Sequence, residues 1–118
     1  MTQSHLHYDH VGNHDKFVDI VFPDLEHLRL LESKGTMSLS ASQHLGFVEN
    51  TETPKIRVTK WLGPDAEIDL GNRTIKMIHA PGHTPDSIVL LDPVNQMLFT
   101  GDLIYYGPLF AMLPGCRN

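Results

Sequence analysis

The stretch His5-Leu6-His7-Tyr8-Asp9-His10 is the most informative part of this sequence, because it places four side chains of metal-binding type within six residues. In an extended segment alternate residues point to the same side, so His5, His7 and Asp9 can face one cavity. A bend near Asp9 would bring His10 to that cavity from the next turn. Imidazole and carboxylate together suit zinc, iron, manganese or nickel, and the lack of cysteines in the stretch argues against a structural thiolate site.

Two later segments carry side chains of the same kind. The loop Pro81-Gly82-His83-Thr84-Pro85 holds one imidazole between two predicted strands, where the prolines stiffen the backbone and the glycine permits close approach. Asp102 follows Gly101 at the end of another predicted strand, and beside a histidine cluster its carboxylate becomes a candidate bridging ligand. A solvated histidine-rich N-terminus is the alternative interpretation, which the interleaved apolar and aromatic residues do not favour.

Composition limits the class of protein. The chain has 118 residues, of which 41% are hydrophobic and 19% charged, and this balance fits one globular domain. The formal net charge of −5 argues against nucleic acid or an anionic membrane as a partner, since both require a basic patch. No apolar run approaches the about 20 residues of a membrane span. The polar first residues and the single cysteine, Cys116, predict a cytoplasmic protein without a signal peptide.

The first half of the chain carries both strand and helix signals. Val18–Phe22 is short, apolar and β-branched, which predicts a buried strand. A proline, an acidic residue and a leucine stripe then predict a helix over residues 23–34 that ends at Gly35 and packs its leucines on the core. Residues 36–54 are aperiodic, which predicts a loop with at most a turn of helix around 40–45.

From Ile56 onwards the hydrophobic period changes from 3.6 to 2, which predicts a run of antiparallel strands. Gly71-Asn72 is a hairpin signal between two of them. The predicted strands cover residues 56–60, 68–70, 73–79, 87–91 and 96–100. The fold class is therefore α+β, with His83 and Asp102 in loops at strand ends, where a rigid scaffold positions functional residues.

The three motifs together resemble those of the metallo-β-lactamase superfamily of metallohydrolases, and they occur in the family's order over nearly the whole chain. The resemblance implies an αββα sandwich, present here in part. It also implies two metal ions held by the motif residues. The implied first-metal ligands are His5, His7 and His83, the implied second-metal ligands are Asp9 and His10, and Asp102 would bridge both ions.

Two features depart from the family pattern. Strands normally precede the first motif, and here only residues 1–4 do; a further histidine normally follows the bridging aspartate, and here none follows His83. Residues 1–118 are therefore expected to be a partial domain whose second metal binds more weakly than its first. Sheet edges left without their normal neighbours would favour self-association.

The resemblance implies a hydrolase whose dinuclear zinc site, with iron or manganese as alternatives, activates water against an ester, thioester, lactone or similar bond of a small molecule. Asp9 would be the catalytic residue that orients the nucleophile and shuttles its proton. Trp61-Leu62 and residues 68–73 and 105–115 resemble thioesterases and glyoxalase-II-like members. Two alternatives remain: a non-catalytic metal-binding fragment, or an iron-containing redox relative of the same fold.

Three further residues have a predicted place. His79, four residues before His83, is expected to be a half-buried strand residue, with support of a metal ligand as the alternative. His44 lies in the long predicted loop, where a position beside the substrate is possible. Cys116 lacks an activating neighbour in sequence, so a nucleophilic role is not expected.

Overall fold

The computed structural model describes residues 1–107, in which short strands form three sheets. β1 (Val21–Pro23) pairs in parallel with β5 (Lys60–Leu62). An antiparallel sheet joins β2 (Glu32–Ser33), β3 (Thr36–Ser38) and β4 (Lys55–Arg57). A second antiparallel sheet joins β6 (Glu67–Asp69), β7 (Thr74–His79), β8 (Ile88–Asp92) and β9 (Met97–Phe99). The helices are α1 (Tyr8–Val11), α2 (Glu26–Arg29) and α3 (Ala41–His44), with 3-10 turns η1 (His14–Lys16), η2 (Gly46–Val48) and η3 (Gly101–Leu103).

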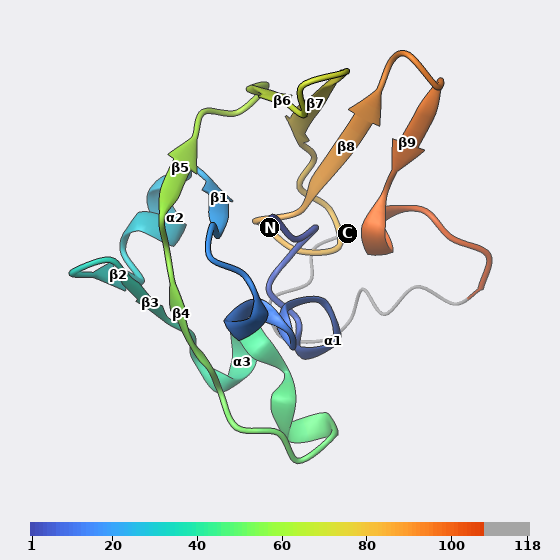
Figure 1. Cartoon of the computed structure of the whole chain (residues 1–118). Coiled ribbons are helices and arrows are strands. Elements are labelled where there is room, and N and C mark those ends of the chain that lie inside the picture. Colours follow the sequence, from blue (N-terminus) through green and yellow to red (C-terminus); the bar gives the residue numbers. More distant parts are fainter. Residues whose placement is uncertain (108–118) are drawn as a thin grey trace.

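The N-terminal residues lie between the two halves of the molecule. Figure 1 shows β1 to β5 on one side and β6 to β9 on the other, with the start of the chain between them. The Val21 amide donates to the Met1 carbonyl, and the Ile88 amide donates to the Ser4 carbonyl, each over 2.8 Å. These two bonds tie residues 1–4 to both halves and bring His5 to the point where the halves meet.

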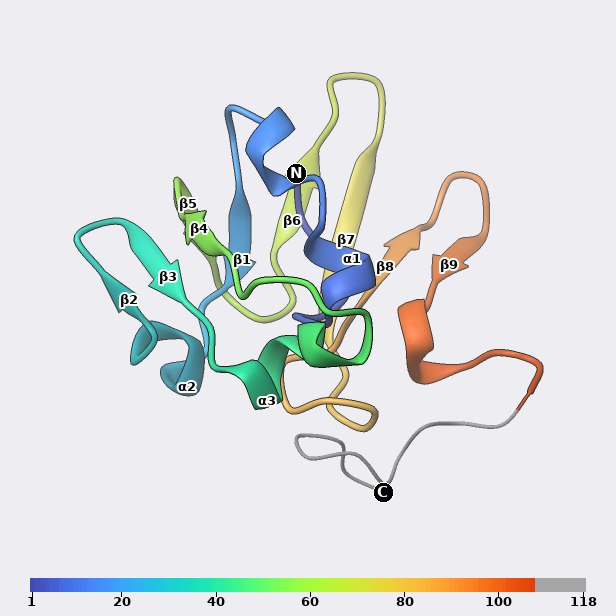
Figure 2. The same cartoon turned by 90° about the horizontal axis from the view of Figure 1, so that it is seen from below.

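The apolar core lies beneath the first motif. Leu6 and Val11 are 2% and 0% exposed, and they pack with buried residues of β1, α2, β3 and β4. Burying side chains of this size contributes about 1.5–3 kcal/mol each. The predicted alternation is confirmed for residues 5–7, because Leu6 belongs to the core and His5 and His7 do not, but it does not extend to Asp9, which lies in α1. Viewed from below, α1 and α3 lie side by side (Figure 2), and the rings of Tyr8 and His44 are in contact there.

The predicted helix over residues 23–34 is wrong in extent. Only Glu26–Arg29 is helical, and Leu30 is 80% exposed. Gly35 is a turn residue rather than a helix end: Lys34 and Gly35 both have positive φ, 51° and 78°, and they connect β2 to β3. The leucine stripe did not require a long helix. A hairpin follows α2 immediately, and its Met37 fills the core beside Leu28.

The strand predictions from residue 68 onwards are confirmed, whereas the strand predicted over 56–60 is divided into β4 and β5, which join two other sheets. β7 and β8 closely match the predicted ranges, and β6 and β7 form the predicted hairpin around Gly71, whose φ is +89°. The helical turn near 40–45 is also confirmed, as α3 with a Ser40–Gln43 capping box. Two details differ from prediction. The strand predicted over Val18–Phe22 begins only at Val21, with Val18 77% exposed, and β5 pairs in parallel with β1 instead of joining the predicted antiparallel run.

Candidate metal centre

The first motif bends where α1 begins. His7 is the residue immediately before the helix, in an extended conformation, so His5 and His7 belong to an extended segment while Asp9 and His10 belong to a helical turn. The expected bend is therefore present, one residue earlier than predicted. As a result, His10 lies close to His5, with 4.1 Å between the ring centroids. Asp9, in contrast, no longer belongs to the extended segment that carries His5 and His7.

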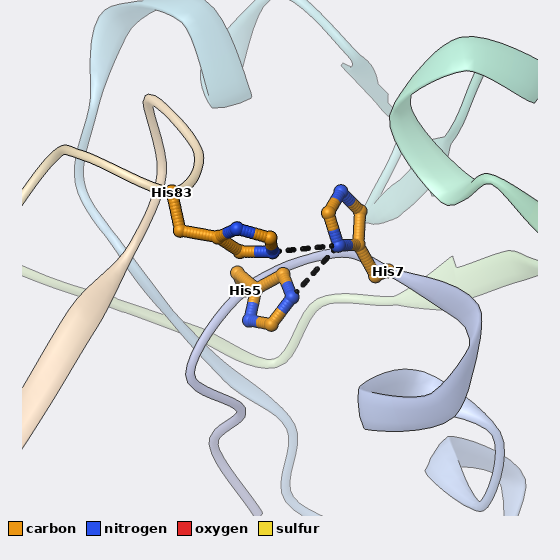
Figure 3. Close-up of side chains that lie close together, drawn as sticks. All are labelled: His5, His7 and His83. Carbon is orange, nitrogen blue, oxygen red and sulfur yellow. Dashed lines mark hydrogen bonds between the residues drawn. The ribbon is translucent and has the colours of Figure 1, made fainter. Parts of the chain in front are cut away.

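Three buried imidazoles converge in the first cluster, formed by His5, His7 and His83. The Nε2 atom of His5 lies 2.9 Å from Nδ1 of His7, and Nε2 of His83 lies 3.1 Å from the same atom (Figure 3). The three residues are 2%, 6% and 8% exposed, respectively. An imidazole nitrogen offers either one proton or one lone pair, so Nδ1 of His7 cannot satisfy both neighbours as a hydrogen-bond partner.

The same convergence fits a metal ion. Nitrogens about 2.0–2.1 Å from a tetrahedral zinc ion lie roughly 3.3 Å apart, close to the separations measured here. Burial lowers the pKa of His5 to about 2 and that of His7 to about 4, with further lowering from the neighbouring histidines. Both rings are therefore neutral at pH 7, which is the form that binds metal.

A second cluster shares His5 with the first and adds His10 and Asp102. The ligand atoms within each cluster all lie within 4.8 Å of one another. One carboxylate oxygen of Asp102 lies 3.4 Å from Nε2 of His10, and the other lies 3.7 Å from Nε2 of His83. Asp102 therefore stands between the two clusters with one oxygen toward each, which is the placement that a bridging ligand requires.

Asp9 is the predicted site residue that belongs to neither cluster. Its nearest carboxylate oxygen is 3.6 Å from Nε2 of His10, and its side chain is 54% exposed. Asp9 nevertheless lines the same cavity as His7 and His83 of the first cluster. The cavity has a volume of about 430 Å³ and is lined by His7, Tyr8, Asp9, Leu45, Val48, His83, Asp102 and Tyr105.

Ser4 is a site residue that the sequence analysis missed. Its Oγ lies 3.0 Å from Nδ1 of His5 and 3.0 Å from Nδ1 of His10. When each ring carries its proton on Nδ1, the hydroxyl oxygen accepts two hydrogen bonds, and the Nε2 lone pairs of both rings face the site. The available signal was a hydroxyl residue directly before the first histidine. Gly101 lies against Ser4, because a Cβ added there would be 2.5 Å from the Ser4 Cβ.

Side chains around the loop that carries His83 hold its backbone. The ring of His79 donates from Nε2 to the Pro85 carbonyl over 2.9 Å. Thr84 donates its amide to the Ser87 hydroxyl over 3.1 Å, and the two hydroxyl oxygens are 2.7 Å apart. His79 is half-buried on β7, as predicted, and it also supports the ligand loop. His44 is 3% exposed and packs behind Tyr8, outside the residues that line the cavity.

The comparison with known families agrees with this geometry. The model of the metallo-beta-lactamase superfamily matches residues 3–115, which include all three motifs. The chain belongs to the metallo-beta-lactamase superfamily. Two solved structures share its fold. One is described as the BLEG-1 B3 metallo-beta-lactamase, with a TM-score of 0.72 and 20% identity. The other is described as TTHA1623 in a di-iron-bound form, with a TM-score of 0.69 and 24% identity.

The chain corresponds to part of these longer proteins. Each of the two structures aligns with 98% of this chain, which covers 56% of either one. A curated relative, the acyl-coenzyme A thioesterase MBLAC2 of Gallus gallus, is 29% identical over 123 residues, which are 94% of this chain and 43% of the relative. The predicted partial sandwich is thereby confirmed. Cys116 and most of the stretch 105–115 lie outside the described residues, and no helix among those described could span a membrane.

The metal-free form of this superfamily member is expected to lose stability as the pH falls below about 6.5. His5 and His7 stay neutral in the folded state down to pKa values of about 2 and about 4, whereas they titrate near 6.5 when unfolded. The unfolded state therefore binds more protons in this range, which lowers the free energy of unfolding by about 1.4 kcal/mol per pH unit for each histidine. Urea unfolding in the presence of a chelator would measure it, and a pH-independent midpoint would contradict it.

Replacing Ser4 with alanine is expected to weaken zinc binding by about 10–100-fold, the usual effect of removing a group that orients metal ligands. The reason is that both His5 and His10 would lose the oxygen that fixes their ring orientation. Competition with a chromophoric chelator measures the affinity. The matched control is Ser33→Ala, since Ser33 is exposed on β2 and contacts neither cluster. Equal affinities of the two variants would show that Ser4 does not orient the ligands.

Proposed function

We propose that this chain carries the metal centre of a hydrolase that uses two zinc ions against a thioester or a related ester or lactone of a small molecule. The observation that carries the proposal is the pair of clusters that share His5, with Asp102 between them, at the wall of a cavity. The thioester is favoured because the Gallus gallus relative is named an acyl-coenzyme A thioesterase. The net charge of −5 favours a small-molecule substrate over nucleic acid or a membrane.

The residues would divide the chemistry as follows. His5, His7 and His83 would hold the first ion, and Asp102, His10 and Asp9 would hold the second. When bound, zinc supplies Lewis acidity and a water of lowered pKa. Asp9 would accept the proton of the attacking water, because its exposed carboxylate lines the cavity next to His10. A cytoplasmic location would suit a chain whose single cysteine has no internal partner.

The test is metal content and turnover of the same sample. Protein purified without chelator would be analysed for bound metal and assayed for thiol release from a short acyl thioester. Two zinc ions per chain with thiol release support the proposal. One zinc ion without turnover favours the non-catalytic metal-binding alternative. Iron with visible absorbance favours the redox alternative, which the ligand set permits because imidazole and carboxylate also bind iron.

We further propose that the chain self-associates through β9, the edge strand of the four-stranded sheet. Met97, Leu98 and Phe99 are each about half exposed, and within residues 1–107 β9 pairs only with β8. Such an edge offers both unpaired backbone groups and apolar side chains. Leu98→Lys is expected to weaken self-association on the order of tenfold, measured by sedimentation over a range of concentrations. The matched control is Val94→Lys in the preceding turn, and equal effects of both would contradict a role for β9.

A further inference from the structure

The cavity at the metal centre is lined by residues of two chemical kinds. The polar residues are His7, Asp9, His83 and Asp102, all from the three motifs. The apolar residues are Leu45 and Val48, from the segment that ends α3 and forms η2, and the aromatic rings of Tyr8 and Tyr105 complete the lining. A site that combines a few polar groups with apolar side chains is suited to a ligand with one reactive polar end and one apolar end.

The backbone at Leu45 is held in a conformation that a leucine rarely adopts. Its φ and ψ are 54° and 16°, in the left-handed region. The surroundings maintain it: the Leu45 amide donates to the Ala41 carbonyl, and Thr51 donates its amide to the Gly46 carbonyl over 2.7 Å. Backbone strain of this kind persists where the surrounding structure fixes it and often marks a binding site. The Leu45 side chain lines the cavity and is 3% exposed.

The next residue, Gly46, is closely packed against its neighbours. A Cβ added at Gly46 would lie 2.5 Å from both the His44 Nδ1 and the Thr51 Oγ1. This close packing fixes η2, the turn that carries Val48. The Val48 side chain is 55% exposed although it lines the cavity, so its apolar surface is open to an incoming ligand. Tyr8 is tied to the same segment, since its hydroxyl lies 3.5 Å from the Glu49 carboxylate.

The charge of the wall distinguishes the two ends of a thioester. Among the described residues that line the cavity there is no lysine or arginine, and two are aspartates. The described lining therefore offers no cationic side chain to bind a polyanionic leaving group, such as a nucleotide-bearing thiol. An uncharged alkyl chain needs no such partner, and it gains from covering the exposed surface of Val48.

We propose that Leu45 and Val48, with the ring of Tyr8, form the binding site for the apolar acyl chain of the substrate, while its carbonyl group reaches His83 and Asp102. The inference rests on the proposed hydrolase function, because it takes the cavity to be the place where an acyl compound reacts. It adds the residues that select the substrate. It also sets a direction of preference: longer straight acyl chains bind more tightly than acetyl, up to the length that fills the cavity.

The test measures binding rather than turnover. The probes are acetate, butyrate, hexanoate and octanoate, titrated into the full chain with and without zinc and followed by calorimetry or by methyl NMR signals. Each added methylene is expected to lower the dissociation constant about two- to fourfold, the lower value applying where the wall stays half exposed. Val48→Asp should remove this dependence on chain length. The matched control is Val94→Asp, since Val94 is 70% exposed in the turn before β9 and does not line the cavity.

The outcomes separate this inference from the function on which it rests. A chain-length dependence that survives in Val94→Asp but not in Val48→Asp supports the acyl site, and it does so even where no thioester is hydrolysed. Equal chain-length dependence in the two variants overturns the acyl site, and so does equal binding of all four carboxylates. The acyl site is also overturned if the zinc-bound protein binds none of the four carboxylates. Leu45→Ala is a second test variant, for which we expect weaker octanoate binding and unchanged acetate binding.

Discussion

Replacing His83 with alanine is expected to weaken the first zinc site on the order of 100- to 1,000-fold. Four-ligand zinc sites bind with about 10–16 kcal/mol, so one ligand of four corresponds to roughly 2.5–4 kcal/mol. His83 is the member of the first cluster that comes from the half formed by β6 to β9. Its loss therefore leaves that cluster with only the two histidines of the first motif. The Nε2 atom of His83 meets Nδ1 of His7 at 3.1 Å across 76 residues of sequence.

The measurement is zinc content after dialysis against a weak chelator, followed by a competition titration. The control is His27→Ala, which removes an exposed imidazole outside both clusters and should leave zinc binding unchanged. Thermal unfolding of metal-free His83→Ala and wild-type protein separates loss of a ligand from loss of the fold. Wild-type zinc content in His83→Ala would contradict the assignment of His83 to the first site.

The sequence was most informative where the ligands are close together in the chain. His5, His7 and His10 lie within six residues, so spacing and one bend suffice to bring their rings close together. His83 and Asp102 were candidates because of their positions in loops at strand ends, and the family resemblance implied their ligand roles. The fold brings both residues to the same place. Ser4 was missed because a serine before a histidine has many ordinary roles. Only the fold shows its hydroxyl meeting the rings of both His5 and His10.

The errors in the fold come from contacts that are distant in sequence. Strand β1 pairs with β5 across almost 40 residues, and nothing local in Val21–Pro23 indicates that partner. The helix predicted over 23–34 failed for a related reason: β2 and β3 gain a third partner in β4, and this pairing outweighs the helical period of the leucines. The antiparallel run from β6 to β9 was predictable because each strand pairs with its chain neighbour.

Replacing Asp102 with asparagine should remove the second of the two proposed zinc ions and reduce the proposed hydrolysis on the order of 1,000-fold, while the first ion stays bound. The substitution keeps the size of the side chain and removes its negative charge. That charge faces His10 at 3.4 Å and His83 at 3.7 Å. A second divalent ion placed near the first is repelled by it, and a bridging carboxylate offsets this repulsion more than any neutral ligand can.

The second site is also the one with fewer partners among the described residues, since Asp9 is half exposed and belongs to neither cluster. Its ion is therefore expected to be the first to leave when charge is removed. The control is Asp15→Asn, which makes the same chemical change at an exposed position beside Lys16. Stepwise zinc titration should show one tight site and one lost site in Asp102→Asn, the opposite of the pattern in His83→Ala. Loss of both ions in Asp102→Asn would mean that the clusters form a single site rather than two that share a bridge.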